Sequence, residues 1–229
     1  MFVWRAEVLP GVSVAFTDSA AGNLALHVGD DGRSVMRRRE ELEAAAGIAP
    51  RRFQYMNQVH GNHVAVMESG GPAPTADAMV SRGLPLAVMV ADCIPLVLVG
   101  DGSAGPVLGV VHAGRPGLAS GVIPAALDQL RTAGATEIRA WLGPSICGRC
   151  YEVPADLRAD VAAVVPSAWS TTSWGTPALD LPAGAASQLE SEGVLIEYRG
   201  PCTLETDALY SYRRDRQSGR FAGLAWTHE

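Results

Sequence analysis

The sequence predicts an α+β protein in which strands and helices are mingled along the whole chain. Of its 229 residues, 48% are hydrophobic and 18% are charged, a balance that supports a full buried core. In the middle of the chain several expected strands follow one another without an intervening helix, which argues against a strictly alternating parallel sheet. No repeat, linker or low-complexity tract interrupts the pattern, so we expect a single domain over residues 1–229.

The expected strands are short apolar or alternating runs bounded by glycine, proline or aspartate. In chain order they are VSVAFT, FQYMNQV (53–59), HVAVM (63–67), LAVMVA (86–91), PLVLVG (95–100), VLGVVHA (107–113), RAWLG, VLIEYRG and FAGLAWT. Residues 167–177, SAWSTTSWGTP, show the least pattern and are expected to form a surface loop.

The expected helices have apolar residues at helical spacing and, in two cases, a glycine at the end. They are RSVMRRREELEAAAG, closed by Gly47, GLASGVIPAALDQLRTAG, closed by Gly134, PADLRADVAAVV and LPAGAASQLESEG.

Composition excludes several classes of function. The chain has a net charge of −6 and lacks a dominant basic stripe, so it shows no electrostatic footprint for duplex nucleic acid. All eighteen basic side chains are arginine, which excludes a lysine Schiff base and a phosphate-loop lysine. Arginine would therefore have to bind any anion, and its planar fork suits phosphate.

The chain is expected to be a cytoplasmic protein. Its first residues, MFVWRAEVLPGVSVAF, lack a charged leader before a long apolar core, and no apolar run reaches the eighteen or so residues of a membrane span. Four cysteines do not make a disulfide framework in a chain of this size, which favours a reducing compartment.

Two histidines lie three residues apart in NQVHGNHV (57–64). In a strand an odd offset sends side chains to opposite faces, so one metal ion is not expected to bind both. His60 precedes Gly61, where the backbone can bend and expose the imidazole ring at a strand end. His63 opens the next apolar run and is interpreted as a surface or packing residue.

Cys93 and His112 also lie at the ends of expected strands, next to loops. Cys93 follows LAVMVAD and comes two residues before Pro95, and His112 is followed by the glycine-rich turn AGRPG. Together with His60, they offer two imidazoles and a thiolate, which zinc accepts as three ligands with a fourth position open for catalysis. The residues alone leave a second interpretation, in which Cys93 is buried and both histidines are hydrogen-bonded.

Seven ordered blocks resemble the YfiH-like family, also labelled polyphenol oxidase, laccase-domain or purine nucleoside phosphorylase, over nearly the whole chain. The blocks are NLALHVGDD (23–31), NQVHGNHV, ADAMVS (76–81), ADCIPLVLV (91–99), VVHAGRPGLASGV (110–122), WLGPSICGRCYEV (141–153) and CTLETDALYSYRRDRQSGR (202–220). The resemblance implies a layered α/β/β/α sandwich with mixed sheets, and zinc bound by His60, Cys93 and His112 as catalytic metal ligands.

The resemblance also implies activity on purine nucleosides. The expected reactions are phosphorolysis of adenosine, inosine, guanosine and methylthioadenosine, and hydrolytic deamination of adenosine. Zinc lowers the pKa of bound water to about 7, which suits deamination, while phosphorolysis requires a phosphate dianion held beside the ribose.

Five residues are candidates for substrate binding. Arg39 matches the basic residue that follows the family's LHVGDD segment, Arg213 and Arg214 belong to SYRR, and Asn23 lies in the segment that resembles the family's SLNLG. Asp77 of ADAMV and Asp92 before Cys93 could each orient a ligand imidazole or act as a general acid or base, and Glu152 is a third candidate. Asp77 is preferred for the pocket, because strand geometry points Asp92 away from the side that Cys93 faces.

Two segments depart from the family pattern. The family commonly has HAGWRG after the second ligand histidine, whereas here HAGRPG puts Arg115 in the tryptophan position and Pro116 in the arginine position. The front loop FTDSAAGNLALHV is also shortened.

The CxxC formed by Cys147 and Cys150 could indicate redox chemistry or a second zinc site. Beyond this pair the chain has only Cys93 and Cys202, so a structural site with four cysteines is not expected, and the pair is interpreted as two ordinary cysteines near a turn.

Two other functions remain open from the sequence. His60, Cys93 and His112 also resemble a copper ligand set, so a copper-binding phenol oxidase is an alternative. A true multicopper oxidase is excluded, because only His27, His63 and His228 remain for further coppers. The second alternative is a non-catalytic partner in cell-wall or peptidoglycan editing.

Overall fold

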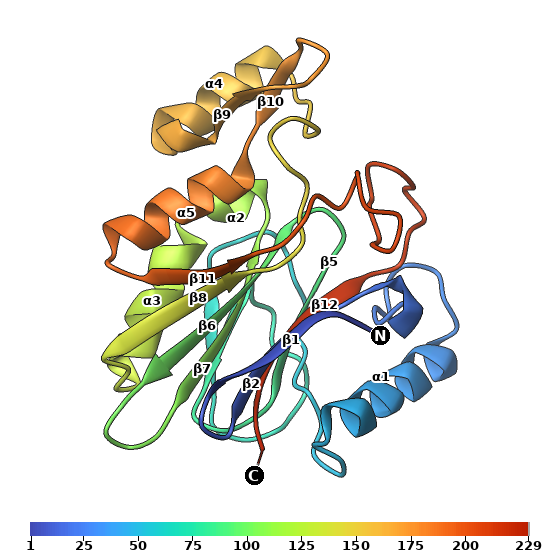
Figure 1. Ribbon diagram of the computed structural model, residues 1–229, viewed down its shortest axis with the longest axis vertical. Coiled ribbons are helices and arrows are strands. Elements are labelled where there is room, and N and C mark those ends of the chain that lie inside the picture. Colours follow the sequence, from blue (N-terminus) through green and yellow to red (C-terminus); the bar gives the residue numbers. More distant parts are fainter. Residues whose placement is uncertain (229) are drawn as a thin grey trace.

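The computed structural model describes residues 1–228, which form two large β-sheets packed face to face between helices (Figure 1). The strands are β1 (Phe2–Leu9), β2 (Val12–Thr17), β3 (Val64–Met67), β4 (Ala78–Ser81), β5 (Leu86–Val90), β6 (Ile94–Asp101), β7 (Val107–Ala113), β8 (Glu137–Leu142), β9 (Trp169–Thr171), β10 (Pro177–Leu179), β11 (Leu195–Arg199) and β12 (Phe221–Thr227). The helices are α1 (Gly32–Ala46), α2 (Arg115–Ala119), α3 (Val122–Thr132), α4 (Ala155–Val164) and α5 (Leu181–Ser191), with short 3-10 turns η1 (Ser19–Ala21) and η2 (Pro166–Ala168).

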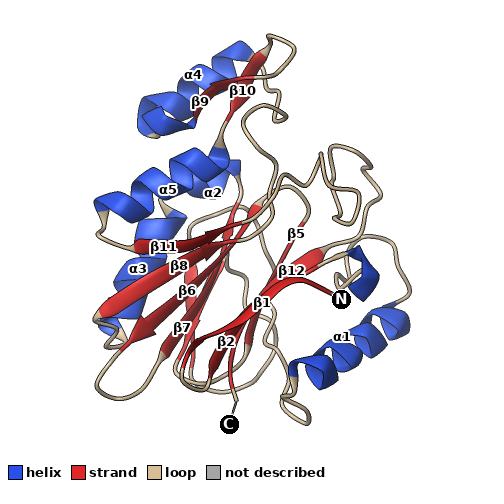
Figure 2. Ribbon diagram, in the orientation of Figure 1, coloured by secondary structure: helices blue, strands red, loops and turns tan. Residues whose placement is uncertain are grey.

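The larger sheet has the strand order β11-β8-β6-β7-β4-β3, and the smaller one has the order β1-β2-β12-β5. The smaller sheet is antiparallel throughout. In the larger sheet only the outer pairs, β3 with β4 and β11 with β8, are parallel. Both sheets lie at the centre of the molecule, and most helices cover the far face of the larger sheet (Figure 2). The prediction of mixed sheets is confirmed.

Three hydrophobic layers hold these elements together. Leu98 of β6 and Leu127 of α3 belong to the layer between the larger sheet and its helices, and Val97 of β6 and Phe16 of β2 belong to the layer between the sheets. Leu42 of α1 belongs to a third layer, over the outer face of the smaller sheet. The predicted α/β/β/α sandwich is confirmed.

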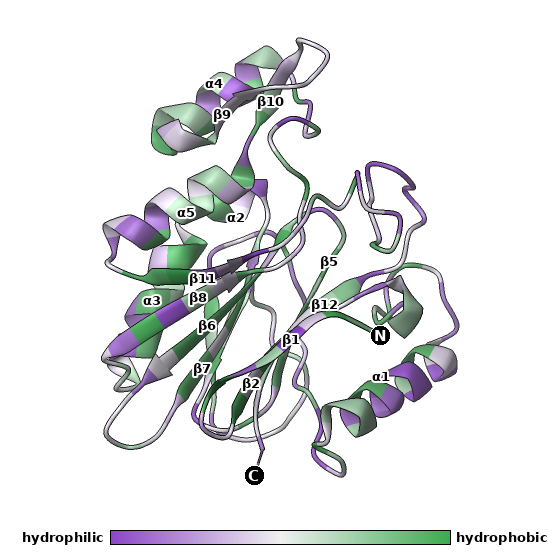
Figure 3. Cartoon of the chain, in the orientation of Figure 1, coloured by the Kyte–Doolittle hydropathy of each residue, from purple (hydrophilic) through white to green (hydrophobic). Residues whose placement is uncertain are grey.

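The long apolar runs of the central strands follow from burial on both faces. Along β6, Leu96 and Leu98 face the helices, while Val97 and Val99 face the other sheet. A strand buried on both sides has no reason to alternate apolar with polar residues. Figure 3 shows the resulting hydrophobic colour along the central strands.

The helix predictions are confirmed, with one division. Asp31 caps α1 by accepting a hydrogen bond from the Ser34 N–H, and Gly47 ends it in the left-handed conformation (φ 80°). The run predicted as one helix before Gly134 forms α2 and α3, because Gly121 at φ 84° breaks it. Pro124 lacks an N–H, which also disfavours a continuous helix through this point.

One predicted strand is wrong. FQYMNQV (53–59) has the composition of a strand, yet it forms only isolated bridges at Gln54 and Asn57. Each bridge contacts a different segment, Leu86 for the first and Thr75 for the second. The segment passes between two neighbours, so no continuous ladder forms.

The expected loop at 167–177 is also wrong in part, because it contains β9 and the start of β10. Thr172 closes this hairpin: its Oγ1 lies 2.8 Å from that of Thr176 and accepts the Thr176 N–H at 2.9 Å. The sequence reading also missed β1 and β4. In β1 the residues Phe2, Trp4, Ala6 and Val8 are half-buried and alternate with the exposed Val3, Arg5 and Glu7, which is a detectable strand signal.

Within residues 1–228, no helix combines the length and apolar character needed to cross a bilayer.

We expect Gly143→Ala to destabilise the contact between the sheets. A Cβ at position 143 would lie 2.4 Å from the Phe16 ring and 2.7 Å from Pro95 Cγ. Phe16 is fully buried, so its ring cannot move aside. Overpacking of this kind lowers the free energy of unfolding by about 1–3 kcal/mol. Urea unfolding should show it, with Gly71→Ala as the control, because a Cβ there meets nothing within 4 Å. Equal midpoints for both variants would contradict the packing argument.

Candidate functional site

The fold brings together three side chains that are distant in sequence. His60 lies in the irregular segment before β3, Cys93 directly precedes β6, and His112 lies in β7. Their potential ligand atoms all lie within 4.8 Å of one another. Cys93 Sγ is 3.8 Å from His60 Nε2, and the two imidazole ring centroids are 4.6 Å apart. Because β6 and β7 are antiparallel with Ile94 opposite Ala113, the start of one strand meets the end of the other at this point.

Asp77 holds the backbone around His60. His60 has a left-handed backbone (φ 61°), which is uncommon for a residue other than glycine. The Asp77 carboxylate accepts hydrogen bonds from the N–H groups of Val59, His60 and Gly61, at 3.1, 2.9 and 2.6 Å. Three converging amides therefore fix the turn that presents the His60 ring.

Asp77 also orients His112. Asp77 Oδ1 lies 2.8 Å from His112 Nδ1, so the neutral ring carries its proton on Nδ1 and presents Nε2 toward the cluster. Burial would raise the pKa of Asp77, but hydrogen bonds from His112 and from the Gly61 and His60 amides lower it. Asp77 is fully buried, so it positions the site from behind and is not exposed to the pocket.

Glycine at position 114 lets the three residues approach. A Cβ there would lie 2.7 Å from His60 Cδ2 and 3.1 Å from Cys93 Sγ. The glycine of the HAG motif is therefore explained by the space that the cluster needs.

The electrostatics favour a thiolate. Burial disfavours ionisation of Cys93, but the charge and hydrogen bond of His112, with the hydrogen bond and charge of His60, lower its pKa to about 6. Burial likewise disfavours the charged form of His112, yet Cys93 and Asp77 raise its pKa to about 9. At neutral pH and without a metal, these shifts favour a Cys93 thiolate beside a His112 imidazolium. A bound cation would replace the imidazolium proton as the partner of the thiolate.

The donor set fits zinc. Zinc is bound by thiolate sulfur and imidazole nitrogen at about 2.0–2.3 Å, which in a tetrahedron puts the ligand atoms about 3.3–3.6 Å apart. The 3.8 Å between Cys93 Sγ and His60 Nε2 is close to this spacing. The carboxylate partner of His112 is the usual companion of a zinc-bound histidine.

The cluster lies in the wall of a cavity of 490 Å³, a size typical of small-molecule sites. Its polar and aromatic lining includes two arginines and two tyrosines beside the cluster. The lining residues are His27, Gln58, His60, Met89, Val90, Ala91, Asp92, Cys93, His112, Ile146, Tyr151, Leu181, Tyr212, Arg213 and Arg220.

Of the predicted substrate-binding residues, Arg213 is the one that lines this cavity. Its guanidinium lies 4.8 Å from the centre of the Tyr151 ring, and Nη1 donates to the Glu152 carbonyl. The Arg213 N–H donates to Asp92 Oδ2 at 2.7 Å, which ties this arginine to the residue before Cys93.

The structure places the other candidates away from the cavity. Arg39 is buried against the Tyr55 ring and donates to the Leu24 carbonyl, next to an adjoining cavity of 340 Å³. Asn23 bonds Ala25 through both its amide oxygen and its amide nitrogen, and so shapes the front loop. Arg214 stabilises the loop after β11, because its guanidinium donates to the carbonyls of Thr203, Leu204, Thr206 and Leu209.

Several residues of the pocket were missed by sequence reasoning. Arg220 lines the cavity. It is the last residue of the motif block that also contains Arg213, so the block itself was a signal for it. Tyr151 stands beside Cys93: burial and Cys93 raise the pKa of Tyr151, while Arg213 and Arg115 oppose that rise. Arg115, which replaces a tryptophan of the family pattern, therefore lies close to the pocket wall.

Comparison with known proteins gives one family and a group of named relatives. The family model described as multi-copper polyphenol oxidoreductase laccase matches residues 6–228. A purine nucleoside phosphorylase of Streptomyces coelicolor is 46% identical, covering 98% of this chain and 99% of that protein. One from Streptomyces griseus is 47% identical over 96% of each chain. A protein of the same name from Mycobacterium tuberculosis is 44% identical, over 89% of this chain and 84% of that one.

Solved structures show the same fold. A Neisseria meningitidis protein superposes with a TM-score of 0.84 at 33% identity, covering 100% of this chain and 99% of that one. YlmD from Geobacillus stearothermophilus gives 0.84 at 28% identity, over 98% and 94% of the two chains. YfiH from Bacillus licheniformis gives 0.84 at 25% identity, over 94% and 92%.

Proposed function

This chain belongs to the multi-copper polyphenol oxidoreductase laccase family, which includes the YfiH proteins, and we propose that it is a zinc-dependent purine nucleoside phosphorylase with adenosine deaminase activity. The observation that carries the proposal is the convergence of His60, Cys93 and His112 beside a cavity with arginines in its wall. The names of the relatives from Streptomyces and Mycobacterium support the substrate class.

Zinc would be held by the two imidazoles and the thiolate, where it would supply Lewis-acid chemistry that polarises an oxygen atom of the substrate or of water. Asp77 fixes the His112 tautomer and the His60 turn, so it is a positioning residue. Tyr151 and Tyr212 line the cavity, where their rings would contact a flat purine.

The arginines would bind phosphate. Arg213 and Arg220 line the cavity that holds the cluster, and a guanidinium fork matches phosphate oxygens. In phosphorolysis a phosphate oxygen forms a bond to C1′ of the ribose as the bond from C1′ to the base nitrogen breaks, and the electron pair leaves with the base. In deamination the oxygen of water bonds to C6 of adenosine and ammonia departs. The cavity of 490 Å³ supports this proposal, because a substrate bound in it would lie beside the cluster and both arginines.

The copper alternative has a specific weakness. The chain has five histidines, two of which belong to the cluster, while a multicopper centre requires many more. A single copper ion at the same three ligands would have to act by an oxidase chemistry other than that of a multicopper centre. Cytoplasmic location forms part of the proposal, because Cys93, Cys147, Cys150 and Cys202 are all unpaired thiols.

The test is conversion of inosine and phosphate by the zinc-loaded protein. We expect hypoxanthine and ribose 1-phosphate in equal amounts, and inosine with ammonia from adenosine in the absence of phosphate. A parallel reaction with a phenol, followed by oxygen uptake, examines the copper alternative. A fully zinc-loaded protein that turns over no purine nucleoside would exclude the proposed function.

Arg213→Ala and Arg214→Ala should affect different properties, although the residues are adjacent: the first should weaken phosphate binding, and the second should lower stability. A hydrogen bond to a charged group is worth about 1.5–3 kcal/mol, so loss of Arg213 should raise the KM for phosphate about 10- to 100-fold. Loss of Arg214 removes contacts to four carbonyls and should lower the free energy of unfolding by about 1–3 kcal/mol, with KM unchanged. Phosphate titrations and urea unfolding of both variants measure this. Equal KM values for wild type and Arg213→Ala would remove Arg213 from the phosphate site.

A further inference from the structure

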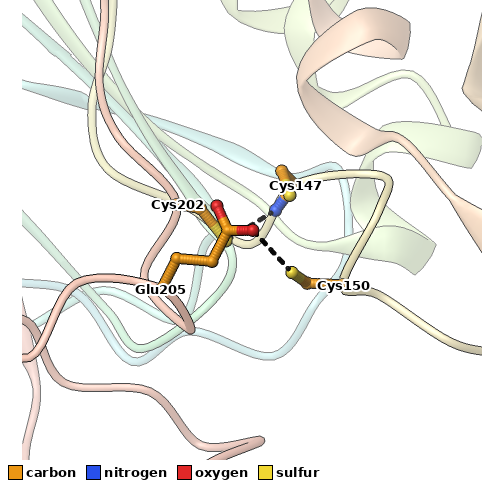
Figure 4. Close-up of side chains that lie close together, drawn as sticks. All are labelled: Cys147, Cys150, Cys202 and Glu205. Atoms are coloured by element: carbon orange, nitrogen blue, oxygen red, sulfur yellow. Dashed lines mark hydrogen bonds between the residues drawn. The ribbon is translucent and has the colours of Figure 1, made fainter. Parts of the chain in front are cut away.

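A second group of metal-ligating side chains lies outside the candidate active site. Cys147, Cys150, Cys202 and Glu205 have potential ligand atoms that all lie within 4.8 Å of one another. Figure 4 shows these four side chains gathered at one point between two loops. One loop follows β8, and the other follows β11.

Backbone pairing brings the two loops together. Ser145 forms a parallel β-bridge with Cys202. The Ser145 N–H donates to the Pro201 carbonyl, and the Thr203 N–H donates to the Ser145 carbonyl. This bridge sets Cys202 beside the start of the CxxC. The pairing extends the contact between β8 and β11, the parallel strands that end just before these loops.

The CxxC itself forms a tight turn. The N–H groups of Cys150 and Tyr151 both donate to the Cys147 carbonyl at 3.0 Å. Gly148 in this turn packs closely, because a Cβ there would lie 2.6 Å from Asp180 Cβ and 2.7 Å from Ser170 Oγ. Both thiols of the pair are therefore held on a fixed backbone.

The structure adds two neighbours to the pair that the sequence interprets as two ordinary cysteines near a turn. A structural site with four cysteines is not expected from the sequence, because only Cys93 and Cys202 remain and they form no second CxxC. Tertiary pairing brings Cys202 to the pair, and the carboxylate of Glu205, three residues later, supplies the fourth donor. Zinc accepts a carboxylate oxygen as well as thiolates.

The contacts within the group bring its donor atoms together, and one of them, a backbone N–H aimed at a sulfur, suits a thiolate ligand. The Cys147 N–H donates to Cys202 Sγ at 3.4 Å, and Cys150 Sγ lies 3.5 Å from Glu205 Oε1. Arg149, inside the CxxC, lies 3.8 Å from Glu205 Oε1 and offsets part of the negative charge.

We propose that Cys147, Cys150, Cys202 and Glu205 bind a structural zinc ion, separate from the site formed by His60, Cys93 and His112. Three sulfurs and one oxygen complete a tetrahedron, which leaves no open position for a substrate. Thiolate-rich, four-coordinate sites select zinc over the harder cations. Neither the laccase-family membership nor the phosphorylase activity requires this second ion.

The second ion would brace the wall of the active-site cavity. Ile146 and Tyr151, which line the cavity, directly flank the CxxC. Thr203, next to Cys202, is fully buried and donates through Oγ1 to Asp92 Oδ1 at 2.6 Å. Asp92 has a left-handed backbone (φ 86°) immediately before Cys93. The loop that holds the structural ion therefore fixes the backbone that presents Cys93.

The test uses the full-length protein in which the first site has been removed by His60→Ala and Cys93→Ser. Metal analysis should find one zinc per chain in this background. Its zinc-edge X-ray absorption should show three sulfurs at about 2.3 Å and one oxygen at about 2.0–2.2 Å. No cysteine of the second site is changed in this measurement, so folding of a cysteine variant does not limit it. Absence of zinc, or a shell without three sulfurs, would overturn the proposal.

Adding Cys150→Ser and Cys202→Ser to that background should reduce the zinc content to below a tenth of one equivalent. In the otherwise wild-type chain, the same two changes should leave one zinc, bound at the first site. The readout is zinc content throughout, so it does not depend on catalytic activity. Glu205→Gln should retain zinc and replace only the carboxylate oxygen in the absorption spectrum. Retention of a full equivalent by the background with both serines, or a disulfide among these cysteines in protein purified without oxidant, would contradict the site.

Discussion

His60→Ala should lower kcat/KM for phosphorolysis of inosine about 1,000-fold, which corresponds to about 4 kcal/mol of transition-state stabilisation. A catalytic metal ion contributes several kcal/mol, and the variant keeps only one imidazole and one thiolate to hold it. Cys93→Ala should cause a similar loss, since Cys93 supplies the negative charge of the cluster. Zinc analysis and inosine kinetics on the same preparations would connect the two effects.

His63→Ala is the matched control, because it removes the same type of side chain three residues away. His63 is exposed and stands outside the cluster. Its loss should leave zinc content and kcat/KM within about twofold of wild type, as is usual for surface substitutions. Equal activity of His60→Ala and His63→Ala, at wild-type zinc content, would mean that His60 has no role in the reaction.

The strands and helices that the sequence predicted are those in which burial leaves a local pattern. Strand β6 is buried on both faces, so its apolar run identifies it without reference to the rest of the fold. The segment 53–59 has an equally strand-like composition, but its two bridges go to different neighbours, which composition does not encode. Strand β1 carries the alternating pattern of an edge strand, so its sequence does encode its structure.

The candidate site was predictable by residue type and less so by role. Strand ends pointed to His60, Cys93 and His112, and the family resemblance grouped them, which the structure supports by placing their ligand atoms close together. Arg213 and Arg214 are adjacent in one motif, yet one lines the cavity and the other clamps a loop. Side-chain direction in an irregular loop depends on tertiary contacts, so sequence alone could not separate them.

The group of Cys147, Cys150, Cys202 and Glu205 also depends on tertiary contacts that the sequence does not reveal. Cys202 is more than fifty residues from the CxxC, at a separation of 55 residues from Cys147. Motif spacing does not predict which distant segment completes a pair of ligands. The bridge between Ser145 and Cys202, formed by the backbone, decides it.

Asp77→Asn should reduce zinc affinity at the first site about 10- to 100-fold while preserving the shape of the buried side chain. The carboxylate accepts from three backbone N–H groups and from His112 Nδ1, so every contact that it makes requires an acceptor. An asparagine has only one acceptor oxygen, and its NH₂ group must face a donor. If the amide turns its NH₂ toward His112, Nδ1 becomes the acceptor and the proton moves to Nε2, the nitrogen that faces the cluster. A protonated Nε2 cannot bind a metal ion.

Asp77→Asn should also lower the free energy of unfolding by about 1–3 kcal/mol, because at least one buried amide donor is left facing another donor. Glu43→Gln provides the control, since Glu43 of α1 is likewise buried and accepts from the Phe53 N–H, away from the cluster. Competition with a zinc chelator, on a background with Cys150→Ser and Cys202→Ser, measures affinity at the first site alone. A loss of stability with wild-type zinc affinity would show that Asp77 supports the fold without setting the His112 tautomer. Weaker zinc binding in Asp77→Asn, with Glu43→Gln unchanged, is the result that the hydrogen-bond geometry requires.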